Sequence, residues 1–344
     1  MKISFKNDYS EGAHPAILEA LLQTNRQQQP GYGLDDYSEQ AKALIRERIG
    51  NPQAEIFFVS GGTQANLLVL GHILRPHESI IACQSAHIAD HETGAIEAVG
   101  HKIHLAPSDN GKLSPEQIRD YASRYTNVPH QVQPRLVYIT QTTEIGTLYS
   151  LAELKAIWQC CQELGLLLYM DGARLAQALS AEGNDIGWED LARYTDIFYI
   201  GATKCGALLG EAIVFNRSAL AEYFSFYIKQ KGALLAKGRL LGLQFLTLFQ
   251  NNLYEELGRV ANTQMKRIKE AFVAKGIGFL SDTCTNQLFP ILTQRQIAQL
   301  SADFDFYLWQ KVDAEHTAIR LITSWAMEDS QVEVLLRAIE GLTP

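Results

Sequence analysis

Residues 166–174 have the sequence LLLYMDGAR, in which an uninterrupted apolar run ends at Asp171 and Arg174 follows shortly after. Five consecutive apolar residues predict a strand at Leu166–Met170 that is buried on both faces, as in a parallel sheet covered by helices. Similar short apolar runs alternate with helical patterns on either side of it. The middle of the chain therefore predicts an α/β fold with a mostly parallel sheet flanked by helices.

Three further strands are predicted around this central one. A Gly-Gly-Thr turn at residues 61–63 opens a helix through Leu74, and a capping box at Ser150 opens another that runs to about Glu163. Strands separated by helices in this way place their carboxyl ends along one edge of the sheet, where α/β proteins bind ligands. The predicted strands are Glu55–Ser60, Arg135–Thr140 and Ile197–Gly201.

The sequence pattern changes after Asn251. A long helical stretch from Tyr254 to Lys275 is followed by short strand patterns and a final helix. We expect a large α/β domain over residues 1–250 and a smaller α+β domain over residues 251–344. The first 20 or so residues are expected to pack on the smaller domain.

Composition excludes several classes of function. The 344 residues carry a net charge of −8, and no basic stripe is available to bind nucleic acid. No apolar run is long enough for a membrane span, and the N-terminus lacks the apolar core of a signal peptide. Five irregularly spaced cysteines fit reduced thiols better than a disulfide framework. These features predict a cytoplasmic protein.

Polar residues follow the predicted strands at their carboxyl ends. Asp171 and Arg174 follow one strand, Lys204 follows the next, and the turn at residues 61–63 follows a third. Each has a simpler interpretation, since Asp171 could cap a helix, Lys204 could lie on the surface and the glycines could serve packing alone. Their convergence on one edge of the sheet predicts a single pocket.

Pyridoxal 5′-phosphate (PLP) chemistry requires this combination of residues. A lysine holds the cofactor covalently and yields it to the substrate amine, and a carboxylate keeps the pyridine nitrogen protonated. The phosphate binds backbone N–H groups at a helix N-terminus, and an arginine pairs with the substrate carboxylate through two parallel hydrogen bonds. We therefore predict a PLP site built around Lys204.

The chain resembles the threonine aldolase family of fold-type I PLP-dependent enzymes, within the β-eliminating lyase/threonine aldolase superfamily. The resemblance covers nearly the whole chain, and its motifs occur in family order. The motifs are ND (7–8), GYGLDD (31–36), FFVSGGTQAN (57–66), SAHI (85–88), MDGARL (170–175), YIGATKCGALLGEA (199–212) and IRLITSWA (319–326).

The resemblance implies a role for each residue of the cofactor site. Lys204 would bind PLP covalently, and Asp171 would pair with the pyridinium nitrogen. His87 would stack on the ring, although a histidine in core or surface packing is the simpler alternative. Gly62 and Thr63 would hold the phosphate. The HIADH run at residues 87–91 lacks the glutamate of a zinc HExxH motif and an obvious third ligand, so no metal is expected.

The substrate-binding residues follow from the same resemblance. Arg174, which also belongs to the predicted cofactor site, and Arg320 would clamp the substrate carboxylate. Arg320 lies in a strand pattern, so its alternative is a side chain that faces solvent. Asn7 stands near the position of a family serine, and Tyr32 is a further candidate whose alternative is a turn aromatic.

One departure from the family concerns Glu144. Many threonine aldolases have a histidine near the substrate β-hydroxyl, whereas the matching run here is QTTEIG at residues 141–146. Glu144 could act as the catalytic base or adjust the pocket. The QTTE form is similar to a branch that includes phenylserine-type aldolases.

The predicted reaction cleaves a β-hydroxy-α-amino acid of the threonine, allo-threonine or phenylserine type to glycine and an aldehyde. The alternatives are a β-eliminating lyase, a transferase that acts on glycine or alanine, and a PLP-fold protein without catalysis. The resemblance also implies a homodimer or homotetramer with active sites near the subunit interface.

Overall fold

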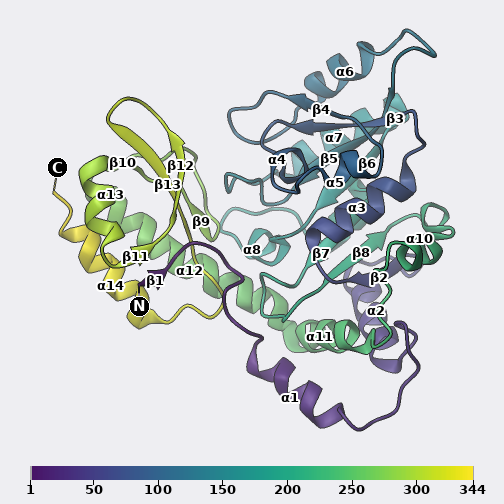
Figure 1. Ribbon diagram of the computed structural model, residues 1–344, viewed down its shortest axis with the longest axis horizontal. Coiled ribbons are helices and arrows are strands. Elements are labelled where there is room, and N and C mark those ends of the chain that lie inside the picture. The colour runs from purple at the N-terminus through teal and green to yellow at the C-terminus, as the bar shows by residue number, and fades with distance from the viewer. Residues whose placement is uncertain (1, 344) are drawn as a thin grey trace.

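The computed structural model describes residues 2–343, which form a larger and a smaller unit joined by one long helix (Figure 1). The larger unit contains a seven-stranded sheet, and the smaller unit carries the strands and helices of the C-terminal part. The predicted fold class, a mostly parallel sheet flanked by helices with a smaller C-terminal α+β part, is confirmed. No helix of residues 2–343 has the length and apolar character needed to cross a lipid bilayer.

The sheet of the larger unit is mixed, and most of its strands are parallel. Strand β8 runs antiparallel to both β2 and β7, and the remaining neighbours pair in parallel. In spatial order the strands are β2 (Glu55–Val59), β8 (Glu211–Phe215), β7 (Ile197–Gly201), β6 (Leu167–Asp171), β5 (Gln133–Thr140), β3 (Glu78–Cys83) and β4 (Ile103–Ala106).

Successive side chains of each strand point to opposite faces of the sheet and enter two separate hydrophobic cores. In β6, Leu168 and Met170 enter the core on one face, while Leu167 and Tyr169 enter the core on the other. One face is covered by α1 (Pro15–Thr24), α2 (Asp36–Arg48), α6 (Pro115–Ser123), α7 (Leu151–Leu164), α8 (Leu175–Leu179), α9 (Trp188–Tyr194) and α11 (Arg239–Phe249). The other is covered by α3 (Gly62–Ile73), α4 (His87–Asp90), α5 (Ala95–Ala98) and α10 (Phe224–Gln230).

The predicted strands and helices are present with small shifts at their ends. Strand β7 has the predicted bounds, β5 begins two residues earlier than expected, and β6 extends to include Asp171. Ser150 forms the predicted capping box with Glu153. Strands β3, β4 and β8 were not predicted, although β3 and β8 are apolar runs of the expected kind.

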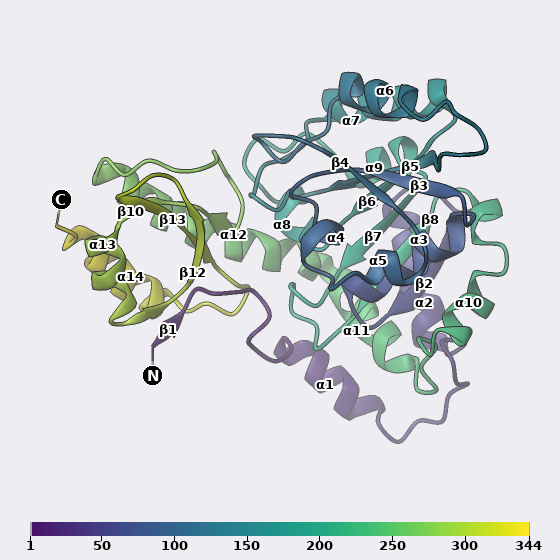
Figure 2. The ribbon, with the colours of Figure 1, turned by 45° about the horizontal axis from the view of Figure 1, so that its top comes forward.

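The smaller unit packs helices against a short antiparallel sheet. Its strands are β9 (Gln287–Leu288), β10 (Ile291–Thr293), β12 (Tyr307–Lys311) and β13 (His316–Ile322), and its helices are α13 (Gln294–Ser301) and α14 (Asp329–Glu340). The N-terminal strand β1 (Ile3–Ser4), which Figure 2 shows at the edge of this unit, pairs in parallel with β11 (Phe304–Asp305). The start of the chain therefore packs on the smaller unit, whereas α1 packs on α11 of the larger one.

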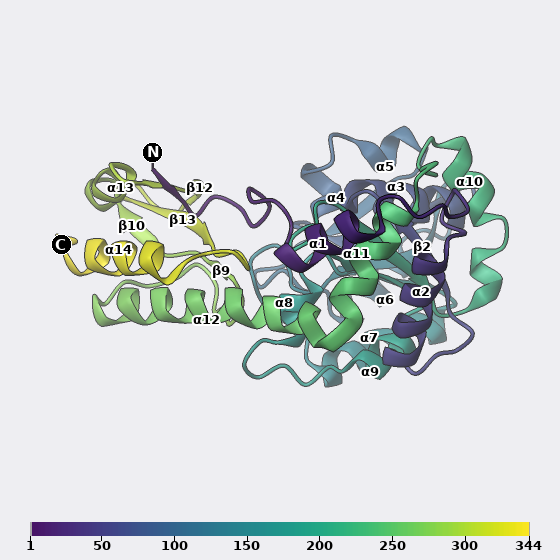
Figure 3. The same cartoon turned by 90° about the horizontal axis from the view of Figure 1, so that it is seen from below.

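Helix α12 (Leu253–Ala274) belongs to both units. Figure 3 shows it running from α8 to a position beneath α14. Tyr254 and Leu257 lie in the core of the larger unit, and Met265 and Ile268 lie in that of the smaller unit. The division at residue 250 stays a prediction, because α12 connects the two units without a break.

Candidate active site

Residues from four strand ends line one cavity of about 230 Å³ in the larger unit. Asp171 ends β6, Lys204 follows β7, and Gly62 follows β2 at the start of α3. The fold therefore brings together the predicted cofactor residues that lie far apart in the sequence. The lining residues are Tyr9, Ser60, Gly61, Gly62, Thr63, His87, Glu144, Asp171, Ala173, Tyr199, Thr203, Lys204 and Glu211.

Asp171 is a buried carboxylate held by four donors. Its Oδ1 accepts hydrogen bonds from the Tyr199 hydroxyl at 2.5 Å and the Ala173 N–H at 2.9 Å. Its Oδ2 accepts from the Tyr138 hydroxyl at 2.5 Å and from Asn66 Nδ2 at 3.1 Å. These donors fix the carboxylate against the cavity wall, which is what a partner for a protonated ring nitrogen requires.

Lys204 has an amine suited to nucleophilic attack. Within residues 2–343 its Nζ has no hydrogen-bond partner, and the side chain lines the cavity. Burial lowers the pKa of Lys204, and the positive charge of Arg174 lowers it further, against the opposing effect of Asp8. A lysine with a lowered pKa has a larger neutral fraction, and the neutral amine is the form that captures a carbonyl carbon.

The start of α3 presents backbone N–H groups that can bind an anion. Gly61 caps the helix in extended conformation without a side-chain hydrogen bond, so the first N–H groups of the helix stay available. A Cβ added at Gly62 would lie 2.9 Å from the Tyr199 hydroxyl, so this position has no room for a side chain. Thr63 adds a hydroxyl at the same helix end.

His87 is the first residue of α4, and its ring orientation is fixed. Its Nδ1 contacts Oε1 of the buried Glu92 at 2.8 Å, and the same oxygen accepts from Asn66. Burial would lower the pKa of His87, but the hydrogen bond to Glu92 and the charges of Glu144 and Asp171 raise it above its ordinary value. The imidazole is therefore held at the cavity with an increased protonated fraction.

A second, larger chamber of about 600 Å³ opens beside the first. Tyr9, His87, Glu144 and Lys204 line both, so the two spaces meet at these four side chains. The chamber is otherwise lined by His91, Arg174, Tyr307, Leu308, Trp309 and Arg320. Most of these additional residues come from the smaller unit.

Arg320 is a half-buried cation without an acidic partner in residues 2–343. Its guanidinium lies over the rings of Tyr307 and Trp309, 5.0 and 4.7 Å from their centroids. Its Nε has no hydrogen-bond partner, and burial together with the charge of Arg174 lowers its pKa. A guanidinium in this state is poised to bind an external carboxylate.

Arg174 is already paired within the protein. Its Nε and Nη2 donate to the two oxygens of Asp8 at 2.8 and 3.1 Å, and Asn286 also donates to Asp8. Both side chains of this ion pair are buried. Arg174 keeps Nη1 for a ligand, whereas Arg320 has its whole guanidinium available.

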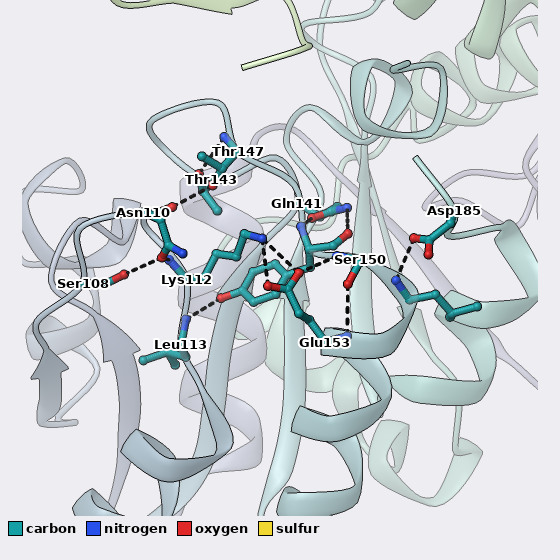
Figure 4. Close-up of polar contacts among 12 residues, drawn as sticks. Ser108, Asn110, Lys112, Leu113, Gln141, Thr143, Thr147, Ser150, Glu153 and Asp185 are labelled. Carbon is teal, nitrogen blue, oxygen red and sulfur yellow. Dashed lines mark hydrogen bonds and ion pairs between the residues drawn. The ribbon is translucent and has the colours of Figure 1, made fainter. Parts of the chain in front are cut away.

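The loop that carries Glu144 is held from several sides. The side chain of Gln141 is hydrogen-bonded to the backbone of Tyr149, and the Thr143 hydroxyl is hydrogen-bonded to Thr147 (Figure 4). From the smaller unit, the Ser281 hydroxyl donates to a carbonyl oxygen of the same loop. The loop therefore presents Glu144 to both cavities from a rigid base.

Two predicted substrate residues lie outside these cavities. Asn7 accepts hydrogen bonds from the backbone of Tyr9 and the hydroxyl of Ser10, and so stabilises its own turn. Tyr32 is 47% exposed, lies under the Lys229 amine and lines neither cavity. Their roles in substrate binding stay predictions.

Several residues of the site were not predicted from the sequence, among them Asp8, Tyr9, Glu211 and Trp309. Asp8 is part of the ND motif, Tyr9 follows it, and Glu211 lies within the lysine motif, so their positions in or beside motifs were an available signal. Trp309 belongs to the edge strand β12, whose sequence gives no sign that it faces a cavity. Only its pairing with β13, which carries Arg320, brings it there.

The fold and the site together define a PLP-dependent enzyme of fold type I. In fold the chain is similar to aspartate aminotransferase from Thermus thermophilus, with a TM-score of 0.74 at 15% identity over 98% of this chain and 90% of that one. The cofactor of the present enzyme is pyridoxal 5′-phosphate. Three features of the cavity fit this cofactor: the Lys204 amine, the Asp171 carboxylate with its four donors, and the glycine turn at the start of α3.

The model of the beta-eliminating lyase family matches residues 6–292. The chain belongs to this family, in its threonine aldolase branch, and is a PLP-dependent lyase. It is 33% identical to the low specificity L-threonine aldolase of Pseudomonas aeruginosa, over 97% of this chain and 96% of the relative. It is also similar to the threonine aldolase structure from Leishmania major, with a TM-score of 0.96 and 45% identity over 98% of both chains.

Proposed function

We propose that this enzyme cleaves a β-hydroxy-α-amino acid of the threonine type to glycine and an aldehyde. The observation that carries the proposal is the junction of the two cavities at Tyr9, His87, Glu144 and Lys204. A substrate whose amine reaches Lys204 has its remaining groups in the larger chamber, beside an acid and an unpaired arginine. The names of the relatives from Pseudomonas aeruginosa and Leishmania major support the same reaction.

The substrate carboxylate binds Arg320 and the free nitrogen of Arg174. Arg320 lies half-buried in the chamber and has no acidic partner among residues 2–343, so an incoming carboxylate neutralises its charge. Holding the carboxylate fixes the rotation of the substrate about its amine. Orientation of this kind selects which bond to the α-carbon breaks.

Glu144 accepts the proton of the β-hydroxyl group as the Cα–Cβ bond breaks. It lines both cavities, and its loop is hydrogen-bonded on several sides, so the carboxylate is held near the substrate side chain. His87, held by Glu92, lines the cofactor cavity and would pack against the cofactor ring. When bound, PLP supplies an electron sink for the pair released at the α-carbon.

The chamber accommodates more than the methyl group of threonine. Its volume of about 600 Å³ and the aromatic side chains of His91, Tyr307 and Trp309 suit an aryl substituent on the β-carbon. We therefore expect phenylserine to be cleaved along with threonine and allo-threonine.

A substrate panel with product identification tests the proposal. L-threonine, L-allo-threonine and phenylserine are each incubated with holoenzyme, and glycine and the matching aldehyde are expected in equal amounts. Ammonia and the matching 2-oxo acid without aldehyde (2-oxobutanoate from threonine or allo-threonine, phenylpyruvate from phenylserine) would instead identify a β-eliminating lyase and overturn the proposal.

Two variants examine the residue assignments in the same assay. Lys204→Ala is expected to lose both the visible absorbance of bound cofactor and the production of aldehyde. Glu144→Gln removes the proton acceptor but keeps the shape, so kcat should fall about 10²-fold or more with the cofactor absorbance intact. A full rate in Glu144→Gln would remove Glu144 from the role of base.

A further inference from the structure

Glu211 is a buried acid in the wall of the cofactor cavity. It is 4% exposed and begins β8, where it lies opposite Val59 at the end of β2 and Gly201 at the end of β7. One carboxyl oxygen, Oε2, accepts a hydrogen bond from the Ala202 N–H at 3.2 Å. Among residues 2–343 this is the one backbone N–H that donates to the Glu211 carboxyl group, whereas four donors hold Asp171.

The surroundings of Glu211 disfavour a negative charge. Burial raises its pKa to about 8, and the charge of Asp171 acts in the same direction, against a hydrogen bond to Thr203 and the charge of Lys204. The other titratable groups that interact with it are the hydroxyls of Tyr169 and Tyr199 on the sheet and of Tyr254 on α12. The same cavity is lined by His87 and Glu144.

We propose that Glu211 is a cofactor-binding residue that acts as a neutral carboxyl group, donating a hydrogen bond into the cavity and excluding cofactor when it ionises. PLP carries a phosphate whose second pKa is about 6, so it is an anion at neutral pH. A cavity of about 230 Å³ that already contains Asp171 and Glu144 would gain another negative charge from ionised Glu211. Protonated Glu211 removes that repulsion and adds a donor.

This proposal concerns the cofactor alone, and its test requires no substrate. Its failure is therefore distinguishable from failure of the proposed aldol cleavage. The dissociation constant of PLP is measured by fluorescence quenching of cofactor-free protein from pH 6.5 to 9.5, for wild type and Glu211→Gln. Comparing the two proteins at each pH cancels the titration of free PLP, which contributes equally to both measurements.

The wild-type affinity should fall relative to that of Glu211→Gln by up to about tenfold per pH unit above pH 8. The matched control is Glu55→Gln, which removes an exposed carboxylate at the opposite end of the β2–β8 ladder, where Glu55 pairs with Phe215. It should follow the wild type at every pH. Equal pH dependence of wild type and Glu211→Gln would overturn the proposal.

An infrared titration of the cofactor-free protein provides a second readout. The wild type should show the carbonyl stretch of a protonated carboxyl group at neutral pH, lost with a midpoint near pH 8 and absent from Glu211→Gln. If that variant does not fold, Glu211→Ser serves to assign the band. A wild-type spectrum without a protonated carboxyl group at neutral pH would contradict the proposal.

Discussion

Removing the charge of Asp8 should destabilise the enzyme by leaving Arg174 buried without its partner. The side chains of Asp8 and Arg174 are 0% and 8% exposed, and two hydrogen bonds of 2.8 and 3.1 Å join them. Loss of one partner from a buried ion pair costs about 3–5 kcal/mol. Asparagine keeps the shape of the side chain and one acceptor oxygen, so Asp8→Asn should lie near the lower end, at about 3 kcal/mol.

The pH dependence of this effect has a defined sign. Burial would raise the pKa of Asp8, but the charges of Arg174 and Lys204 and the hydrogen bonds from Arg174 and Asn286 hold it below its ordinary value. The contribution of Asp8 to stability is therefore complete above the pKa of the unfolded chain, about 3.9, and is lost as the pH falls through the lower folded-state pKa. Wild type and Asp8→Asn should converge in acid.

Urea denaturation of the cofactor-free protein at pH 7 and a fixed protein concentration measures the difference. The control is Glu182→Gln, which breaks the exposed ion pair of Glu182 with Lys266 at 2.7 Å and should leave the free energy of unfolding nearly unchanged. The reasoning is refuted if Asp8→Asn shifts the free energy of unfolding as little as this surface substitution does.

Two further predictions concern the positions of charged groups in the chamber. Trp309→Ala removes one of the rings over which Arg320 lies, so KM for the amino acid should rise about tenfold while the affinity for the cofactor stays unchanged. Trp309→Phe should restore the wild-type KM, whereas a changed cofactor affinity with an unchanged KM would contradict the role of Trp309. Glu92→Gln removes the anion at His87, so the pKa of His87 should fall, which a ¹H NMR titration of the ring detects; a midpoint equal to that of wild type would show that Glu92 does not raise it.

The fold was predictable because its decisive signals are local. The apolar run before Asp171 could be buried only in the middle of a sheet, and β6 occupies that place between β5 and β7. Strand β4 was missed because its sequence, IHLA, carries a polar residue in a four-residue run. The place of α12 in both units could not be predicted, since one continuous helical pattern does not show where its packing partner changes.

The cofactor half of the site was likewise predictable. Lys204, Asp171 and the turn at residues 61–63 lie at strand ends, and parallel strands bring those ends to one edge. The substrate-binding half of the site was harder to predict from the sequence. Arg174 and Arg320 are equivalent as residue types, and only the structure shows that Asp8 occupies one of them while aromatic rings support the other.

The sequence by itself determined four strands of the sheet, its carboxyl edge and the residue types that lie there, because strand patterns and the residues that follow them are encoded within short segments. The tertiary structure alone decided which charges are compensated. Asp8 and Arg174 are 166 residues apart, and the chamber wall brings Tyr9 from the start of the chain together with Arg320 from near its end. Compensation depends on distance and burial in space, and neither quantity is written in the local order of residues.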